Sequence, residues 1–149
     1  MFKFQSEMDS LEKYILIVDD VPDNCWMLQT FLEMEGYKVK IAKDGYEALN
    51  AIASHPPALV LLDMMMPGIT GLEVAKRVRE NQKLPFIPIV MLTAWENLSE
   101  SIDYDSKVDG LITKPIDFEQ LFAKIESFLP ARPQEYVKAS QKNHVEVRM

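Results

Sequence analysis

Three features are scarce in this sequence, and each scarcity argues against a class of protein. There is one cysteine, Cys25, so no internal disulfide can form and nothing indicates an oxidising compartment. No apolar run approaches the roughly 20 residues that span a bilayer, because Asp63 and Pro67 interrupt the longest ones. Residues 1–14 contain acidic side chains and no apolar segment, which argues against a signal peptide. We therefore expect a cytoplasmic protein that does not bind membranes.

Positive charge is the third scarcity. The 149 residues carry 16 Lys and Arg against 23 Asp and Glu, which gives a formal net charge of −7 at pH 7. Attraction to the phosphate backbone supplies most of the non-specific affinity of proteins for nucleic acids. The charge balance therefore argues against direct DNA binding.

Apolar residues, in contrast, are plentiful enough for one core. They make up 48% of a chain that has the length of about one domain. We predict an N-terminal extension at residues 1–12, one domain at 13–129 and a flexible C-terminal tail at 130–149. The tail is too short to build a second core, so no additional output domain is expected.

Short apolar runs alternate with helical patterns along residues 13–129, which predicts an α/β fold with a doubly wound, five-stranded parallel sheet. The predicted strands are Tyr14–Val18, Tyr37–Ala42, Ala58–Leu62, Ile87–Leu92 and Gly110–Thr113. The predicted helices are a segment from Pro22 to the stop at Gly36, then Tyr46–Ser54, Leu72–Val78, a weakly marked segment within Glu96–Asp109, and Phe118–Leu129.

Reactive polar residues follow four of the five predicted strands, each at the point where the strand ends. They are Asp19 and Asp20, then Asp63, Thr93 and Lys114. The carboxyl ends of parallel strands lie along one edge of a sheet, where ligand sites form in open α/β folds. The sequence therefore predicts that these side chains share a pocket.

The charges in this pocket predict a bound cation. Two carboxylates about 4 Å apart repel by roughly 4 kcal/mol at an effective dielectric constant near 20, and three are expected here. A hard divalent ion such as Mg²⁺ binds one or two carboxylates, a carbonyl and waters, and Lys114 supplies a further positive charge. With both present, Asp63 is a candidate nucleophile that accepts a phosphoryl group as a mixed anhydride.

Each of these residues also has a purely structural interpretation. Asp20 precedes a helix that begins with proline, so it could cap that helix, and Asp63 could belong to a turn. Lys114 could be a solvated loop residue, and Thr93 a residue that simply favours a strand. The occurrence of all these residues at strand ends favours the functional interpretation over coincidence.

The chain resembles the receiver domain of bacterial two-component response regulators over about residues 13–129. The resemblance is carried by four segments: Ile15–Asp20, Asp63–Gly68, Leu92–Ala94 and Thr113–Pro115. It implies a flavodoxin-like fold with strand order 2-1-3-4-5. It also implies a stand-alone phosphoacceptor of a two-component or phosphorelay signalling system, with a sensor histidine kinase or a histidine phosphotransfer protein as its partner.

The resemblance assigns roles to individual residues. Asp63 would be phosphorylated, and Asp20, Asp63 and the backbone carbonyl of Met65 would ligate Mg²⁺, with Asp19 reaching the ion through water.

Three groups would contact the phosphoryl group itself. Lys114 would pair with one phosphoryl oxygen, while the Thr93 hydroxyl and the Ala94 backbone amide would donate to another. The Lys114–Pro115 peptide bond would be cis, which the small cis penalty of proline permits.

The sequence departs from the family in the residues expected to transmit the signal. Leu111 occupies a position that usually holds an aromatic switch residue, so we expect Thr93 to move and either the packing of Leu111 or the segment Glu96–Asp109 to transmit the change. Asp103–Asp109 is acidic where many relatives have small apolar residues, which puts the partner surface there in doubt. Homodimerisation and the downstream target stay open.

Two residues of the first helix invite functional interpretations. Trp26 is expected to pack in the core, with a kinase-docking surface as the alternative. Cys25 is expected to be a buried thiol without a function. His55 and His144 are too isolated for a zinc site.

Other functions use similar residues. A phosphatase with an aspartate nucleophile, as in haloacid-dehalogenase-like enzymes, would need a second aspartate two residues after the first, whereas Asp19 and Asp20 are adjacent. A flavin carrier would need glycines and hydroxyls in the first turn instead of carboxylates. A phospho-independent scaffold stays the main alternative. We therefore expect a switch that catalyses only its own phosphorylation and dephosphorylation, not an enzyme with other substrates.

Overall fold

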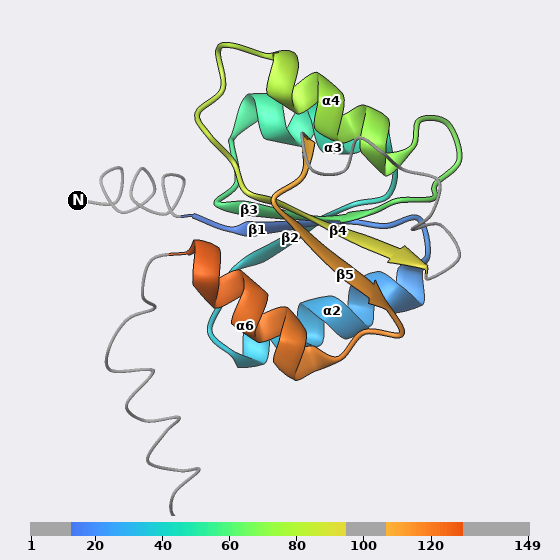
Figure 1. Cartoon of the computed structure of the whole chain (residues 1–149), viewed down its shortest axis with the longest axis vertical. Coiled ribbons are helices and arrows are strands. Elements are labelled where there is room, and N and C mark those ends of the chain that lie inside the picture. The colour runs from blue at the N-terminus through green and yellow to red at the C-terminus, as the bar shows by residue number, and fades with distance from the viewer. Residues whose placement is uncertain (1–12, 95–106, 130–149) are drawn as a thin grey trace, which may run out of the picture.

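The computed structural model describes residues 13–94 and 107–129, which form an α/β fold with one parallel sheet (Figure 1). The five strands lie in the order β2-β1-β3-β4-β5, which confirms the predicted order 2-1-3-4-5. Their bounds are β1 Ile15–Val18, β2 Val39–Ala42, β3 Leu59–Asp63, β4 Ile89–Ala94 and β5 Gly110–Lys114.

Four helices lie among the described residues, and polar side chains begin three of them. Their bounds are α2 Pro22–Met34, α3 Gly45–Ser54, α4 Gly71–Glu80 and α6 Phe118–Phe128. The side chains of Asp44, Thr70 and Asp117 accept hydrogen bonds from backbone amides in the first turns of α3, α4 and α6, respectively. Such caps satisfy amide groups that have no partner within the helix.

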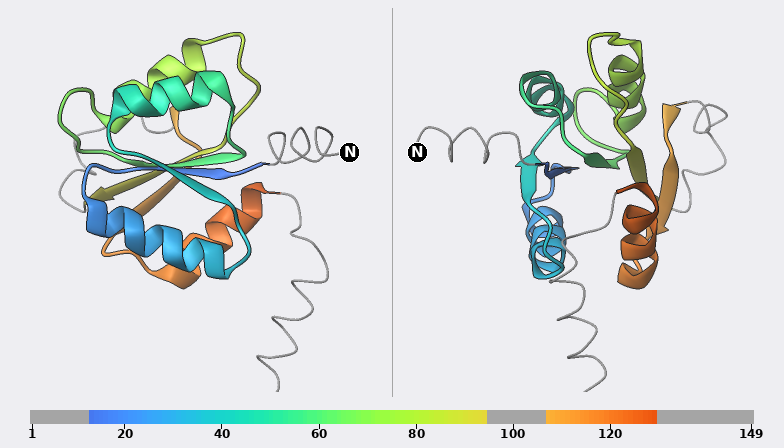
Figure 2. Two further views of the ribbon diagram at one scale, coloured as in Figure 1. Left: turned by 180° about the vertical axis from the view of Figure 1, so that it is seen from behind. Right: turned by 90° about the vertical axis from the view of Figure 1, so that its left-hand side faces the viewer.

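The helices cover both faces of the sheet, as the edge-on view in Figure 2 shows. Alternate residues of each strand point to opposite faces, so Leu16 and Val18 of β1 pack toward α3 and α4, whereas Ile15 and Ile17 pack toward α2 and α6. The central strands β1 and β3 are buried along their whole length. This explains why their sequences are apolar at consecutive positions.

The strand ends differ from the predicted ones in a consistent direction. Strands β1, β2, β3 and β4 start one or two residues later than predicted, and β3, β4 and β5 run on to include Asp63, Ala94 and Lys114. Pairing with neighbouring strands decides these ends, because the ladder continues past the last apolar residue. The N-terminal extension, the C-terminal tail and nearly all of the weakly marked helix lie outside the described residues.

Within residues 13–94 and 107–129, no helix combines the length and the apolar character needed to cross a bilayer.

Candidate functional site

The structure brings three carboxylates together at the carboxyl edge of the sheet. Asp19 and Asp20 follow β1, and Asp63 is the last residue of β3. One carboxylate oxygen from each residue lies within 4.8 Å of the other two. The predicted juxtaposition of the three acidic side chains is therefore observed.

Asp19 is held in place by the start of α2. Its Oδ1 accepts a hydrogen bond from the backbone amide of Val21 at 2.9 Å, and its Oδ2 accepts one from the side-chain amide of Asn24 at 3.3 Å. The Cys25 thiol donates to the Asp19 backbone carbonyl at 3.2 Å. These contacts make Asp19 a buried, oriented carboxylate, and Asn24 is a site neighbour that the sequence analysis missed. Its only signal was its place in the first turn of the helix after Asp19.

Asp20, in contrast, is exposed. The N-cap residue of α2 is Val21, whose own side chain makes no capping hydrogen bond, so the interpretation of Asp20 as a helix cap is wrong. Asp20 therefore reaches the cluster from the solvent side.

Lys114 reaches the cluster from the end of β5. Its Nζ lies 2.9 Å from Asp63 Oδ1, and only 8% of the Asp63 side chain is exposed. The interpretation of Lys114 as a solvated loop residue is therefore wrong. The Lys114–Pro115 peptide bond is cis, as expected.

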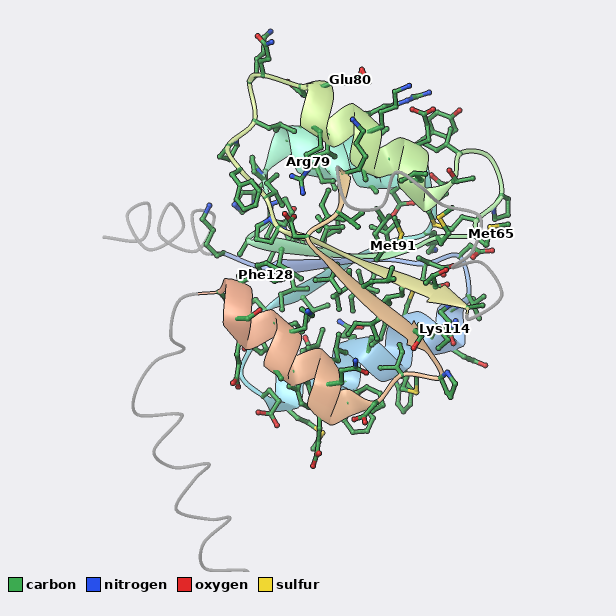
Figure 3. All side chains as sticks on the ribbon, in the orientation of Figure 1. Met65, Arg79, Glu80, Met91, Lys114 and Phe128 are labelled. Atoms are coloured by element: carbon green, nitrogen blue, oxygen red, sulfur yellow. The ribbon has the colours of Figure 1, made fainter. Side chains whose placement is uncertain are left out.

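The remaining predicted site residues line the same edge. Thr93 is buried in β4, and its hydroxyl donates to the Ala94 carbonyl at 3.4 Å, a long hydrogen bond. Met65 follows Asp63 with an exposed side chain, and Figure 3 shows Met65 and Lys114 at the same end of the molecule. Leu111 is the second residue of β5, half-buried against the core beneath α3 and α4. The phosphoryl contacts of Thr93 and Ala94 and the switch role of Leu111 stay predictions.

A glycine lets α4 start directly against Asp63. A Cβ atom at Gly71 would collide with the backbone carbonyl oxygen of Asp63 and touch the Cα atom of Met64. The Gly71 backbone amide donates to the Met64 carbonyl at 2.8 Å. Gly71 therefore fixes the turn that presents the Asp63 carboxylate.

The electrostatics of the cluster act on Asp63 and Cys25. Burial raises the pKa of Asp63, the Lys114 hydrogen bond and charge lower it, and the charges of Asp19 and Asp20 raise it further; the net direction is upward. Burial and the nearby charges of Asp19, Asp20 and Asp63 raise the pKa of the Cys25 thiol to about 11. Burial is thus the main cause of both shifts, and the neighbouring acidic charges add to it.

This donor set fits a hard divalent cation. The cluster offers three carboxylates and one ammonium, so one more source of positive charge would balance it. Carboxylate oxygens, together with carbonyls and waters, are the ligands that Mg²⁺ prefers, and Cys25 offers its thiol to a carbonyl instead of to the cluster. The residues present are therefore compatible with Mg²⁺.

Trp26 differs from its expected place. Its side chain is 69% exposed on α2, so the expectation that it packs in the core is wrong. The buried face of α2 is instead formed by Cys25, Leu28 and Leu32. Trp26 is one residue away from this face, and the helical period turns it outward.

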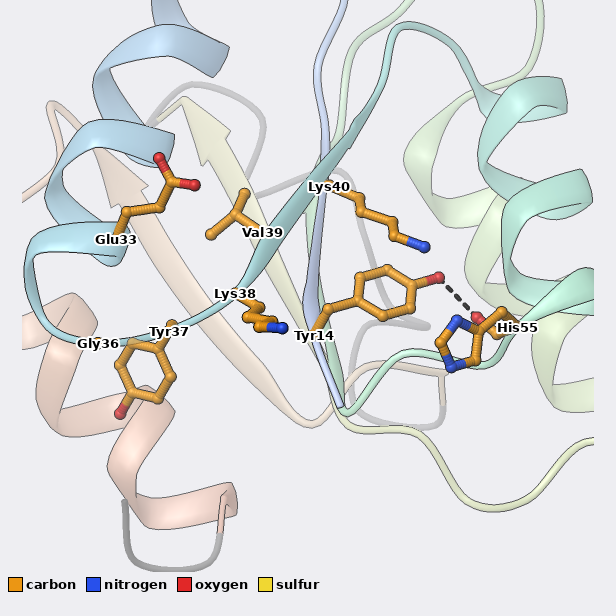
Figure 4. A pocket seen from close by; sticks show the side chains of 8 residues that line it. All are labelled: Tyr14, Glu33, Gly36, Tyr37, Lys38, Val39, Lys40 and His55. Atoms are coloured by element: carbon orange, nitrogen blue, oxygen red, sulfur yellow. Dashed lines mark hydrogen bonds between the residues drawn. The ribbon is translucent and has the colours of Figure 1, made fainter. Parts of the chain in front are cut away.

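A surface pocket of about 400 Å³ lies at the other end of the sheet (Figure 4). Tyr14 and His55 form one side of it, and the Tyr14 hydroxyl donates to the His55 carbonyl at 2.6 Å. Lys40 lies with its Nζ 4.6 Å from the centre of the Tyr14 ring. None of the acidic cluster lines this pocket, so it is separate from the candidate site.

Known proteins are similar to this chain in sequence and in fold. The response regulator receiver domain family matches residues 15–126. The DNA-binding dual master transcriptional regulator RpaA of Synechocystis is 36% identical over 116 residues, which cover 77% of this chain and 48% of RpaA. This chain therefore spans about half the length of that curated relative.

Solved structures agree. The response regulator TrrA of Thermotoga maritima, in complex with Mg²⁺-BeF, superposes with a TM-score of 0.72 at 36% identity, covering 79% of this chain and 100% of TrrA. TrrA in complex with the histidine kinase ThkA gives a TM-score of 0.71 at the same identity, covering 80% of this chain and 100% of TrrA. The chain belongs to the response regulator receiver domain family, and the predicted resemblance is confirmed.

Proposed function

We propose that this chain is the phosphoacceptor of a two-component or phosphorelay system and that Asp63 is the residue phosphorylated. The observation that carries the proposal is the buried Asp63 carboxylate with Lys114 Nζ at 2.9 Å and with Asp19 and Asp20 beside it. The arrangement combines a positioned nucleophile with groups that can balance charge.

In the proposed reaction, an Asp63 carboxylate oxygen attacks the phosphorus atom of a phosphohistidine. An O–P bond forms, the N–P bond breaks, and the imidazole leaves with the bonding electron pair and takes up a proton. Lys114 pairs with an oxygen of the transferred group, and the Thr93 hydroxyl and the Ala94 amide donate to another. The chain catalyses only its own phosphorylation and dephosphorylation.

Asp19, Asp20, Asp63 and the Met65 carbonyl are the groups that would hold Mg²⁺, with Asp19 acting through water. When bound, the ion supplies charge neutralisation for the carboxylates and the phosphoryl oxygens. The hydrogen bonds from Val21 and Asn24 orient Asp19 for this role.

Output from the site involves Thr93 and Leu111 in our proposal. Thr93 moves toward the phosphoryl group, and Leu111, which lies in the paired strand β5, repacks in response. Repacking of the Leu111 side chain changes the volume that it fills in the core, although leucine lacks the hydroxyl and the ring of an aromatic residue.

The proposed partner is a sensor histidine kinase or a histidine phosphotransfer protein, and the solved complex of TrrA with ThkA supports this choice. The exposed side chains of Trp26, Phe31 and Met34 on α2 offer an apolar surface to that partner. The net charge of −7 supports a protein that alters protein contacts without binding DNA directly, and the single cysteine supports a cytoplasmic location. Homodimerisation is compatible with the same function.

The phosphatase alternative is disfavoured because Asp19 and Asp20, which follow β1, are adjacent instead of two residues apart. In addition, the Asp19 carboxylate already accepts hydrogen bonds from Val21 and Asn24. The scaffold alternative is disfavoured because Lys114 is drawn into the cluster, a contact that a vestigial site would not require.

The test is phosphorylation with acetyl phosphate and Mg²⁺, followed by mass-spectrometric mapping of the modified residue. We expect modification of Asp63 in the native protein and none in Asp63→Asn. The exposed Asp23→Asn serves as a control of equal charge change and should be modified normally. With a phosphorylated histidine donor protein, Trp26→Ala should react more slowly, whereas its reaction with acetyl phosphate should be unchanged.

Modification of another residue, or none in a protein with an intact circular dichroism spectrum, would favour the scaffold instead. Equal rates for Trp26→Ala and the native protein with the protein donor would remove α2 from the docking surface.

A further inference from the structure

A compact set of hydrogen bonds lies at the opposite end of β5 from Asp63 and is centred on Arg79. From the last turn of α4, Arg79 donates through Nε to the Lys107 carbonyl at 3.0 Å and through Nη1 to the Ile87 carbonyl at 2.8 Å. Its Nη2 pairs with the Asp109 carboxylate. The planar guanidinium group can serve three acceptors in different directions at once. Figure 3 labels Arg79 near the start of β5 and Lys114 near its end.

Asp109 connects the starts of two strands. The oxygen that pairs with Arg79, Oδ2, also accepts a hydrogen bond from the Ile89 backbone amide at 2.8 Å. The Asp109 backbone amide donates to the Ile89 carbonyl at 2.8 Å. The register Val90↔Gly110 follows directly from this pair. Asp109 therefore sets where β5 begins to pair with β4, and it is not simply part of an acidic partner surface.

Within residues 13–94 and 107–129, few other contacts fix the start of β5. In this part of the chain β5 is an edge strand that pairs with β4 alone. Gly110 has no side chain to pack, Leu111 is half-buried, and Ile112 is the first fully buried residue of the strand. The alignment of β5 therefore depends on its ladder with β4 and on the Arg79–Asp109 pair.

The alignment of β5 determines where Lys114 points. Lys114 pairs with Ala94 at the end of the same ladder, and its Nζ reaches Asp63 at 2.9 Å. A shift of one residue moves the strand by about 3.3 Å and turns every side chain to the other face of the sheet. Even a partial shift would weaken the contact between Lys114 and Asp63.

We propose that Arg79 and Asp109 are positioning residues for Lys114: they hold β5 in the register that places the ammonium group at the phosphoacceptor. The inference rests on the proposed function, because it assigns Lys114 its part in phosphorylation. It adds a requirement at the far end of the strand, where neither residue contacts the acidic cluster.

The first test compares the rate of Asp63 phosphorylation by acetyl phosphate at saturating Mg²⁺ among Arg79→Lys, Asp109→Asn and the native protein. Arg79→Lys keeps the charge, but a single ammonium group cannot serve three separated acceptors. Asp109→Asn keeps an acceptor for Ile89 and removes the ion pair. Arg77→Gln is the matched control, because Arg77 lies on the same helix but pairs with Glu73, at 3.5 Å, and lies over the Tyr46 ring, 5.9 Å from its centre.

We expect both variants to react about 10- to 100-fold more slowly, the loss typical of a misplaced catalytic group, and Arg77→Gln to react normally. In a Lys114→Gln background, Asp109→Asn should cause no further loss, because its effect passes through Lys114. A multiplicative loss in that background, or normal rates in folded variants, would overturn the inference and leave the pair a purely structural role.

A second readout does not require phosphorylation. Lys114 is paired with Asp63, so it should react slowly with an N-hydroxysuccinimide ester, and the labelling rate at Lys114 should rise several-fold in Asp109→Asn. Labelling of Lys76 serves as the internal control. Unchanged labelling of Lys114 would contradict the positioning role. If the native protein fails to be phosphorylated on Asp63, the proposed function fails, and this labelling still decides whether the pair positions Lys114.

Discussion

At the scale of single residues, the candidate site contains a buried negative charge that is not required for folding and that destabilises the protein. Asp63 is buried in β3 beside Asp19 and Asp20, and the single ammonium of Lys114 only partly compensates it. Its pKa is raised by burial first and by the two neighbouring acids as well. A buried carboxylate of this kind costs stability in the absence of a cation. The protein is thus less stable with Asp63 than it would be with an apolar or amide side chain at this position.

The first prediction at this scale is that Asp63→Asn stabilises the protein when metal is removed with EDTA. The pKa of Asp63 is raised in the folded protein above its ordinary value of 3.8, which applies to the unfolded chain. The folded protein therefore binds this proton more tightly than the unfolded chain does. The free energy of unfolding therefore falls as the pH rises from this value through the raised pKa of the folded state, and stays lower at neutral pH. Thermal melts at several pH values should show a higher midpoint for Asp63→Asn than for the native protein at pH 7. The two midpoints should converge below the pKa that Asp63 has in the unfolded chain.

A lower midpoint for Asp63→Asn at neutral pH would contradict this account, because it would mean that the ion pair with Lys114 outweighs burial. Asp23→Asn, on the exposed side of α2, controls for the change in net charge and should leave the midpoint almost unchanged.

At the scale of elements, the site depends on how α4 meets β3. Gly71 opens α4 at a point where any Cβ atom would meet the Asp63 carbonyl and the Met64 Cα atom. These are backbone atoms, so they cannot rotate away as a side chain would. Gly110 presents the opposite case, because the three described atoms nearest to a Cβ atom there all belong to the flexible Lys124 side chain, the closest at 3.1 Å.

We predict that Gly71→Ala lowers the free energy of unfolding by about 1–3 kcal/mol, the usual cost of overpacking, and also slows phosphorylation of Asp63. The cause is a displaced turn after β3. Urea denaturation measures the first effect and the acetyl phosphate reaction the second. Gly110→Ala is the control and should change both by much less; equal effects of the two substitutions would show that the contact with β3 is not the cause.

At the scale of the whole molecule, the ends of β1 and β3 bring negative charges together at one edge of the sheet. Repulsion between these charges destabilises the fold. The chain as a whole is acidic, with a net charge of −7. A cation that binds the folded protein but not the unfolded chain stabilises the fold by mass action. The proposed binding of Mg²⁺ at the acidic cluster would therefore be linked to folding.

We predict that Mg²⁺ at about 100 times its dissociation constant raises the free energy of unfolding by about 2.7 kcal/mol. Melts with increasing Mg²⁺ should show a saturable rise in the midpoint. Asp20→Asn should remove most of this rise, and Asp23→Asn should retain it. A rise of equal size in Asp20→Asn, or one that grows without saturation, would indicate general screening of charge instead of a site.

The sequence by itself determined the α/β class, the strand order through a family resemblance and the set of polar residues at the strand ends. These signals are local: apolar runs mark buried strands, and Asp19, Asp63 and Lys114 follow such runs directly. Because the carboxyl ends of parallel strands lie along one edge of the sheet, these local sequence signals were sufficient to predict a shared pocket.

Only the tertiary structure decided which interpretation of each residue holds. Trp26 is exposed because α2 buries its neighbouring face, Asp20 does not cap α2, and Asp109 pairs with Arg79, thirty positions away. The exact strand ends, the contact of Gly71 with β3 and the distance from Lys114 to Asp63 likewise depend on how distant segments pack. Such packing is a property of the assembled sheet and its helices, because contacts between distant segments leave no periodic pattern in the chain.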